Sequence, residues 1–156
     1  MRHVELCARV RGHSPASVYQ LLGDFKKYPE YTDTVRTVDV TQVDEDRVLS
    51  SWEVNFHRGI LRWTEEDHFK PALYRIDFQQ TVGDIDHFSG YWAVHEDEGG
   101  CVVLFVADLD LGLPGFNEML EPIAELALRD NIHTILEGLL AQPVEMLPTH
   151  STTDRK

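Results

Sequence analysis

The sequence has few cysteines and few basic residues, and it lacks long apolar runs and recognisable metal-binding motifs. Its two cysteines, Cys7 and Cys101, lie in separate predicted strands without CxxC or Cys/His ligand spacing, so we expect two reduced thiols in a cytoplasmic protein. The eight histidines show neither an HExxH motif nor clustered spacing. We therefore predict no metal site.

Basic residues number 14 against 27 acidic ones, which gives a formal net charge of -13. Such a chain is a poor ligand for polyanions, so we expect neither nucleic acid nor an anionic membrane as a partner. No apolar run reaches membrane-spanning length, and the first five residues do not resemble a signal peptide. The length of 156 residues suits one domain, which we assign to residues 1–145, followed by a polar, disordered tail over 146–156.

Short polar links separate runs of strand length over most of the chain, a pattern typical of antiparallel hairpins. Ser14-Pro15 predicts a helix start, and a second short helix is expected over residues 25–31. A long helix is predicted to begin at Asn117 or Glu121 and to end at Ala141. The expected strands cover residues 3–11, 35–42, 47–57, 59–70, 73–82, 86–95 and 101–110.

This order of elements predicts an α+β fold. We expect a seven-stranded curved antiparallel sheet wrapped around a long C-terminal helix, with two short helices after strand one. The long helix has an apolar face at helical spacing, interrupted by Asn131, and should pack across the concave side of the sheet. A curved sheet closed by one helix leaves an internal cavity, which is the usual setting for a small-molecule pocket.

The segment 60–70 places acidic residues on the face that should turn inward. Alternate residues of a strand point to opposite sides, so Glu65 and Asp67 share a face with Leu61, Trp63 and Phe69, while the other face is polar throughout. A close-packed core excludes unpaired carboxylates, so the pattern favours a hollow interior. The alternative is a twist or bulge near Glu65 that turns both acids to solvent.

Glu65 and Asp67 are the candidate catalytic residues. Their carboxylates are neighbours on one strand face, and burial with mutual repulsion would raise at least one pKa. Near neutral pH the pair would then supply a carboxylate base and a carboxylic acid as proton donor. The alternatives are a solvated or salt-bridged pair and a pair that only binds a ligand.

The order of elements and several local motifs resemble the START-like, or Bet v 1-like (SRPBCC), superfamily, and within it the bacterial polyketide aromatase/cyclase group. The resemblance covers about residues 2–141. It rests on the opening segment 1–5, the segment 23–30, Trp63 in the fourth strand, Ser89-Gly90-Tyr91-Trp92 in the sixth, and Asn131 in the last helix.

The resemblance implies a helix-grip fold with an internal cavity that binds a poly-β-ketone presented by an acyl carrier protein. It implies regiospecific aldol closure followed by loss of water, with no metal or organic cofactor, in a monomer or homodimer. It also suggests a set of substrate-binding residues on the strands, the short helix and the last helix. These are Tyr28, Tyr31, Trp63, Gln79, Phe88, Trp92, Phe105 and Asn131.

Some of these residues have simpler interpretations. Trp63 and Trp92 suit core packing as well as cavity lining, and the Asn131 amide would also be satisfied by a sheet residue or a buried water. The pattern of Ile76 and Phe78 argues that Gln79 faces the other way. Trp52 shares a face with apolar residues and is expected to pack in the core.

One position departs from the aromatase pattern. Those enzymes usually carry an arginine a few residues after the tryptophan that matches Trp63, and here the matching position is Asp67. Either the chain closes rings with a carboxylate base, or it belongs to a related branch, such as coenzyme Q-binding lipid or quinone carriers or a ribosome-associated interaction module. For carrier-protein docking, a basic patch around Arg9, Arg11, Lys26 and Lys27 is one hypothesis.

Overall fold

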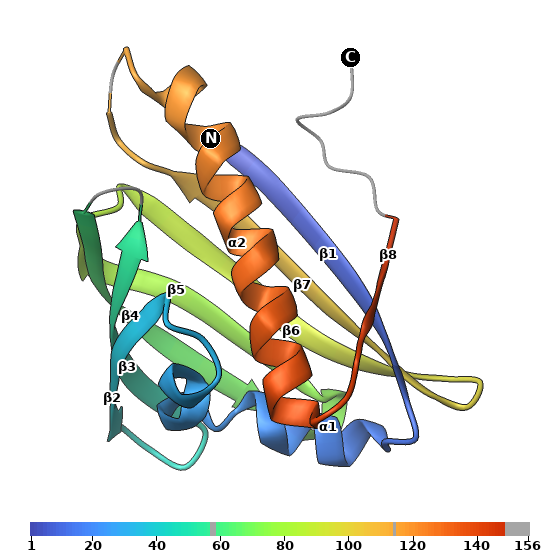
Figure 1. Ribbon diagram of the computed structural model, residues 1–156. Coiled ribbons are helices and arrows are strands. Elements are labelled where there is room, and N and C mark those ends of the chain that lie inside the picture. The colour runs from blue at the N-terminus through green and yellow to red at the C-terminus, as the bar shows by residue number, and fades with distance from the viewer. Residues whose placement is uncertain (57–58, 114, 149–156) are drawn as a thin grey trace.

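The computed structural model describes residues 1–56, 59–113 and 115–148. A curved antiparallel sheet carries one long helix across its concave face (Figure 1). None of the helices in this described part has the length and apolar character that crossing a membrane requires. The elements are β1 (Arg2–Arg11), α1 (Pro15–Leu22), η1 (Phe25–Glu30), β2 (Val35–Gln42), β3 (Arg47–Phe56), β4 (Gly59–Lys70), η2 (Pro71–Leu73), β5 (Arg75–Gly83), β6 (His87–Asp97), β7 (Gly100–Asp110), α2 (Asn117–Leu140) and β8 (Glu145–Leu147).

The described residues form an eight-stranded sheet in the order β2-β3-β4-β5-β6-β7-β1-β8, rather than the seven strands predicted. The additional strand, β8, pairs with β1 from Cys7↔Leu147 to Arg9↔Glu145. The chain after α2 thus adds a strand to the sheet edge, and this strand spans the predicted domain boundary at residue 145. Residues 149–156, where the rest of the tail was predicted, lie outside the described residues.

Local sequence signals explain where the helices begin. The Ser14 side chain caps α1 by accepting a hydrogen bond from the Ser17 amide at 3.2 Å, and Pro15 takes the first turn. The long helix α2 begins at Asn117, the earlier of the two predicted starts. The Asn117 side chain accepts a hydrogen bond from the Leu113 amide at 2.9 Å and donates one to Asp110 at 3.0 Å, which ties the helix start to the end of β7.

The helix α2 is anchored on the β1 side of the sheet. Glu125 of α2 accepts hydrogen bonds from Arg2 of β1 at 2.5 Å and from Arg129 at 2.8 Å. The inward residues Val4 and Val10 of β1 are fully buried, as close packing at this side requires. Because the helix is held against β1, space remains between α2 and the strands on the other side of the sheet, where the cavity described below is found.

Gly90 occupies a place on β6 that has no room for a side chain. A methyl group there would lie 1.9 Å from the carbonyl oxygen of Val106 on the neighbouring strand β7. We expect Gly90→Ala to lower the free energy of unfolding by about 3 kcal/mol or more, since the two strand backbones must move apart. Urea denaturation followed by circular dichroism measures this change.

Gly59→Ala is the matched control, because the nearest atom to the added methyl group lies 3.9 Å away. Its expected change in the free energy of unfolding is within about 1 kcal/mol. Equal stability losses in the two variants would contradict the proposed clash at Gly90.

Candidate active site

A cavity of about 140 Å³ lies between α2 and the sheet. Most of its wall is aromatic or aliphatic, and η1 contributes Phe25 and Tyr28. Among the described lining residues Asn55 of β3 and Ala127 of α2 are exposed, so they mark its opening. The lining consists of Phe25, Tyr28, Thr34, Val35, Trp52, Val54, Asn55, Phe56, Leu61, Trp63, Glu65, Phe78, Ile85, Phe88, Trp92, Phe105, Leu109, Leu111, Ala124, Ala127, Leu128, Asn131, Ile132 and Ile135.

Paired aromatic rings form the wall on the sheet side. Trp52 and Trp63 are directly opposite each other on β3 and β4, and their rings stack with centroids 5.9 Å apart and an interplanar angle of 4°. The Trp63 ring also meets Phe88 of β6 edge-on at 5.6 Å, and Trp92 meets Phe105 at 4.7 Å. Rings held by such neighbours give a rigid, flat surface on which a planar ligand can stack.

Strand β4 alternates as the sequence predicts and brings both acids to the inner side. Glu65 is 5% exposed and lines the cavity, whereas Asp67 is 0% exposed and does not belong to the lining. Both acids lie on the inward face, as predicted from the alternation, but Glu65 alone of the two lies at the cavity wall. Asp67 lies two residues beyond Glu65 on β4 and pairs with Val48 of β3. Val48 is buried and, like Asp67, lies outside the cavity lining.

Two indole N–H groups fix the direction of the hydrogen bonds around the acids. Trp63 Nε1 donates to Glu65 Oε1 at 2.8 Å, and Trp52 Nε1 donates to the Ser50 hydroxyl oxygen at 2.8 Å. Ser50, which is fully buried, in turn donates to Asp67 Oδ2 at 2.5 Å. Since an indole is only a donor, the Ser50 hydrogen is free to point at Asp67, and Asp67 acts as an acceptor.

The two carboxyl groups also form a hydrogen bond with each other, which requires one proton between them. Asp67 Oδ1 has no hydroxyl, amide or ring N–H donor among the described residues, so the shared proton is what satisfies it. Burial raises the pKa of Glu65 well above its usual value, so the proton belongs to Glu65. The pair thus carries one proton and one negative charge at neutral pH.

The pKa values of both acids are raised. Burial raises the pKa of Glu65 well above its usual value, and the neighbouring Asp67 raises it further. Burial also raises the pKa of Asp67 to about 6, while its hydrogen bonds to Glu65 and Ser50 limit the increase. An acid that is protonated near pH 7 beside a carboxylate has both functions needed for proton transfer.

The family model described as polyketide cyclase / dehydrase and lipid transport matches residues 12–136 of the chain. The chain belongs to this family. No curated protein matches it. The helix-grip architecture predicted from the sequence is confirmed by the curved sheet and long helix, and the likeness to the START-like superfamily is confirmed by the family match and by solved structures.

Three solved structures show the same fold as this polyketide cyclase/dehydrase family member. The protein TTHA0849 from Thermus thermophilus has a TM-score of 0.80 at 24% identity, covering 89% of this chain and 94% of that one. The Zhui aromatase/cyclase from Streptomyces sp. R1128 has a TM-score of 0.75 at 19% identity, with coverages of 88% and 93%. A START superfamily protein from Mycobacterium smegmatis has a TM-score of 0.74 at 15% identity, with coverages of 90% and 98%.

In this family member the cavity brings together six of the eight residues predicted to bind substrate. They come from η1, β4, β6, β7 and α2, elements that are far apart in the sequence. These six are Tyr28, Trp63, Phe88, Trp92, Phe105 and Asn131. The hydroxyl of Tyr28 donates to the Leu22 carbonyl oxygen at 2.6 Å, so its ring rather than its hydroxyl is presented to the cavity.

The structure does not bring the other two, Gln79 and Tyr31, into the cavity lining. Gln79 is exposed on the outer face of β5, because strand alternation turns Ile76 and Phe78 inward instead. Tyr31 follows η1 and is absent from the lining. Its ring packs against Gly138 of α2, where an added methyl group would lie 2.5 Å from it. Tyr31 therefore contacts the helix near its C-terminal end.

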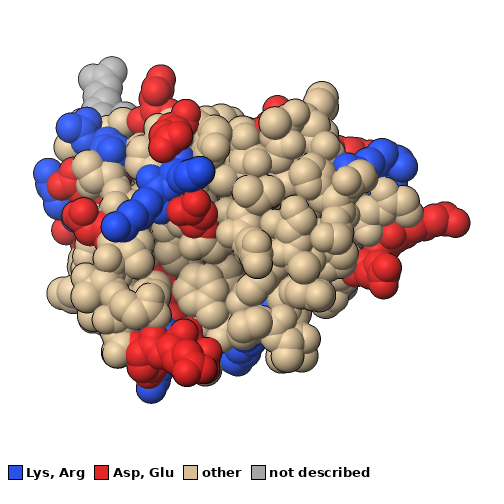
Figure 2. Space-filling view, turned by 90° about the horizontal axis from the view of Figure 1, so that it is seen from below, with Lys and Arg blue, Asp and Glu red and all other residues tan. Residues whose placement is uncertain are grey.

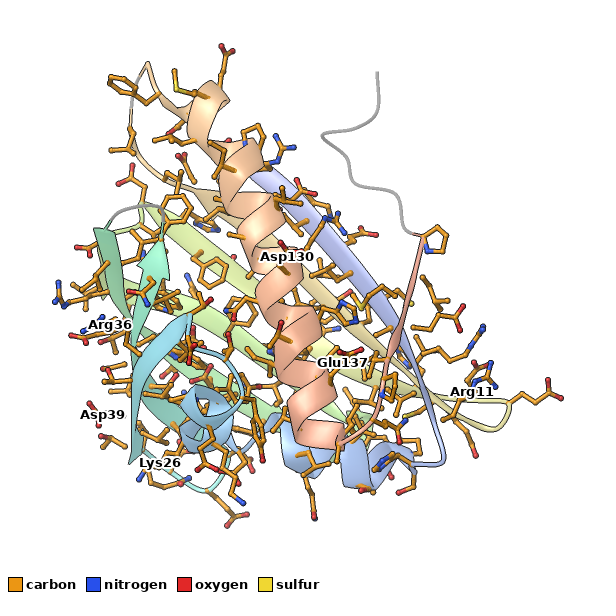
Figure 3. All side chains as sticks on the ribbon, in the orientation of Figure 1. Arg11, Lys26, Arg36, Asp39, Asp130 and Glu137 are labelled. Carbon is orange, nitrogen blue, oxygen red and sulfur yellow. The ribbon has the colours of Figure 1, made fainter. Side chains whose placement is uncertain are left out.

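The suggested basic patch does not form. In the view from below, the Lys and Arg groups are mixed with Asp and Glu groups, and other residues cover most of the centre of this face (Figure 2). Figure 3 shows Arg11 at the end of β1 and Lys26 in η1, on opposite sides of the molecule. Arg9 is paired with Asp97 at 3.4 Å and Glu145 at 3.5 Å. These residues therefore do not present one basic surface to a carrier protein.

Ser50 and the cavity role of Trp52 were missed from the sequence. Ser50 is a fully buried polar residue on the inner face of β3, which is a signal for a hydrogen-bonded role, but its partner Asp67 is 17 residues away in the chain. Trp52 is buried as predicted, and it also lines the cavity. Among the described residues, no group of three or more His, Cys, Asp or Glu is placed to hold a metal ion.

Proposed function

We propose that the protein binds a poly-β-ketone intermediate in this cavity and promotes its aldol cyclisation and dehydration. The observation that carries the proposal is the buried Glu65–Asp67 pair, which presents a one-proton acid–base group at the wall of an aromatic cavity. The family match and the aromatase/cyclase fold support it. A purely apolar cavity would instead have favoured a lipid or quinone carrier.

The pair can carry both proton transfers of ring closure. In the first step the proton of Glu65 moves to the Asp67 carboxylate and Glu65 takes a proton from a methylene group between two carbonyls. The methylene carbon then bonds to a distant carbonyl carbon, and the developing alkoxide receives a proton from Glu65 as the proton on Asp67 returns. In the second step a neighbouring carbon loses a proton to Glu65 while the hydroxyl leaves as water with a proton from the pair. Each step returns the pair to one proton, so no external acid or base is consumed.

Asp67 is a positioning residue in this mechanism. It does not line the cavity, but its negative charge keeps the resting proton on Glu65, and its carboxylate takes that proton while Glu65 accepts one from the ligand. An arginine at this position would stabilise an enolate by its positive charge. Here the carboxyl group of Glu65, which accepts a hydrogen bond from the indole of Trp63, is the polar group that β4 presents to the ligand.

The aromatic walls supply the conformational part of catalysis. A flexible poly-β-ketone folds in many ways in water, and stacking against Trp63 and Trp92 selects folded conformers in which the reacting carbons are close. Holding the reacting groups in place removes entropy from the barrier. The position of the new ring then depends on the cavity shape and on which carbon reaches Glu65.

A reconstituted polyketide synthase with and without this protein tests the proposal. We expect one predominant cyclised aromatic product when the protein is present and a mixture of spontaneously cyclised products when it is absent, as resolved by liquid chromatography and mass spectrometry. An unchanged product distribution would contradict the cyclase function. Native mass spectrometry that finds a co-purified prenyl quinone or fatty acid would favour a carrier.

A further inference from the structure

Three hydrogen-bond donors in the cavity wall are already committed to protein acceptors. Tyr28 donates its hydroxyl hydrogen to Leu22, and Trp52 and Trp63 donate their indole hydrogens to Ser50 and Glu65. The proton of the acid pair lies between the two carboxyl groups. A ligand that enters therefore meets the oxygen acceptors of Glu65 beside Trp63, while Trp92, which also lines the cavity, can offer its indole hydrogen to a ligand carbonyl.

A second acceptor stands on the opposite wall of the same cavity. Oδ1 of Asn131, on α2, is buried and has no hydrogen-bond partner among the described residues. A buried acceptor without a partner is unfavourable, so a ligand that donates a hydrogen bond to it gains affinity. The Asn131 NH₂ group can also donate to a ligand carbonyl next to that hydroxyl group.

The charge of the cavity opposes anions. None of the described lining residues is Lys, Arg or His, and the Glu65–Asp67 pair keeps one negative charge. A carboxylate ligand would lose its hydration in an apolar cavity and would be repelled by that charge. The volume of about 140 Å³ is close to that of a cavity of about 150 Å³ that binds benzene, so one ring at a time is enclosed.

We propose that this cavity selects uncharged, ring-sized ligands that carry a hydroxyl group, either a phenol or the enol of a β-diketone, and that it excludes carboxylates, including fatty-acid anions. The identification of the natural ligand as an enol rests on the proposed cyclase function. The preference for a neutral hydroxyl donor over an anion rests on the cavity alone. The family description includes lipid transport, and this selection separates neutral ligands from fatty acids.

Calorimetric titrations at neutral pH with four single-ring probes test the selection. The reference probe is meta-hydroxyacetophenone, which is neutral and has both a hydroxyl and a carbonyl group. Acetophenone lacks the hydroxyl group and should bind about tenfold more weakly. The anion meta-hydroxybenzoate should bind at least about 100-fold more weakly. Benzylamine is the cationic probe, and it should bind more weakly than the reference, because its ammonium group loses its hydration while the charged carboxylate of Asp67 lies outside the cavity wall.

Two variants assign the selection to named residues. Asn131→Leu should remove the tenfold preference for the hydroxyl group. Asp67→Asn removes the charge of the pair and should reduce the discrimination against meta-hydroxybenzoate by about tenfold or more. Asp130→Asn is the matched control: it makes the same charge change one residue from Asn131, but Asp130 is exposed on α2 (Figure 3), so the discrimination should not change.

Three results would overturn the inference. They are binding of meta-hydroxybenzoate as tight as that of the reference, tighter binding of benzylamine than of the reference, or no binding of the reference at millimolar concentration. Each of these is measured without turnover. A failure here is therefore separate from a failure of the cyclase proposal, which the synthase product distribution decides.

Discussion

Replacing Glu65 by Gln is expected to slow formation of the cyclised product by at least about 100-fold, within the range typical of general acid–base catalysis. Glutamine keeps the shape of the side chain and can still accept the Trp63 hydrogen bond at Oε1. It cannot take up or release a proton, so both ring closure and loss of water are affected. The measurement is the initial rate of product formation in the reconstituted synthase.

Glu66→Gln is the matched control for this variant. It makes the same substitution on the neighbouring residue of β4, which lies on the opposite face of the strand and outside the cavity lining. Its rate should stay within about twofold of the unmodified protein, because no reacting group is changed. If Glu65→Gln and Glu66→Gln have equal rates, Glu65 does not transfer protons in the reaction.

The buried pair should also make the stability of the protein depend on pH. In the unfolded chain both acids have ordinary pKa values near 4, whereas the folded protein raises the pKa of Asp67 to about 6 and that of Glu65 as well. Between these values the folded state binds more protons than the unfolded state, so stability falls as pH rises. For Asp67 alone the loss is roughly 3 kcal/mol across this window.

The double variant Glu65→Gln/Asp67→Asn removes this contribution. Its free energy of unfolding, measured in urea from about pH 4 to about pH 8, should fall by at least roughly 3 kcal/mol less than that of the unmodified protein, because the raised pKa of Glu65 adds to the contribution of Asp67. Exposed acids contribute equally to both proteins and cancel in the difference. Glu66→Gln should follow the unmodified profile. If the stability of the double variant and of the unmodified protein changed with pH in parallel, burial would not raise the pKa values of Glu65 and Asp67.

The alternation of apolar and polar residues along β4 made it possible to predict that Glu65 and Asp67 point inward. Leu61, Trp63 and Phe69 fix which face of the strand is buried, and a side-chain period of two then forces Glu65 and Asp67 to the same side. The expectation of a hollow interior followed from the cost of burying carboxylates without partners. The structure adds the partners, Ser50 and the indoles, which make that burial possible.

The structure differs from the sequence analysis where the placement of a residue depends on the tertiary arrangement rather than on the alternation of neighbouring residues. Gln79 was assigned from the resemblance although the local alternation opposed it, and the alternation was right. Tyr31 and Tyr28 flank one proline, yet the turn of η1 directs only Tyr28 into the cavity. The strand β8 has three residues and, within the described part of the chain, pairs with β1 alone, so too little sequence was available to reveal it.

The sequence by itself determined the order of elements, the inward face of β4 and the acidic character of the site, because strand and helix periodicity are properties of neighbouring residues. Only the tertiary structure decided that Glu65 faces the cavity while Asp67 lies behind it, and that Ser50 and Trp52 supply the hydrogen bonds that place the proton. The physical reason is that burial and pKa depend on which distant strands and helices surround a group. In this protein that arrangement is set by the pairing of β3 with β4 and by the anchoring of α2 to β1.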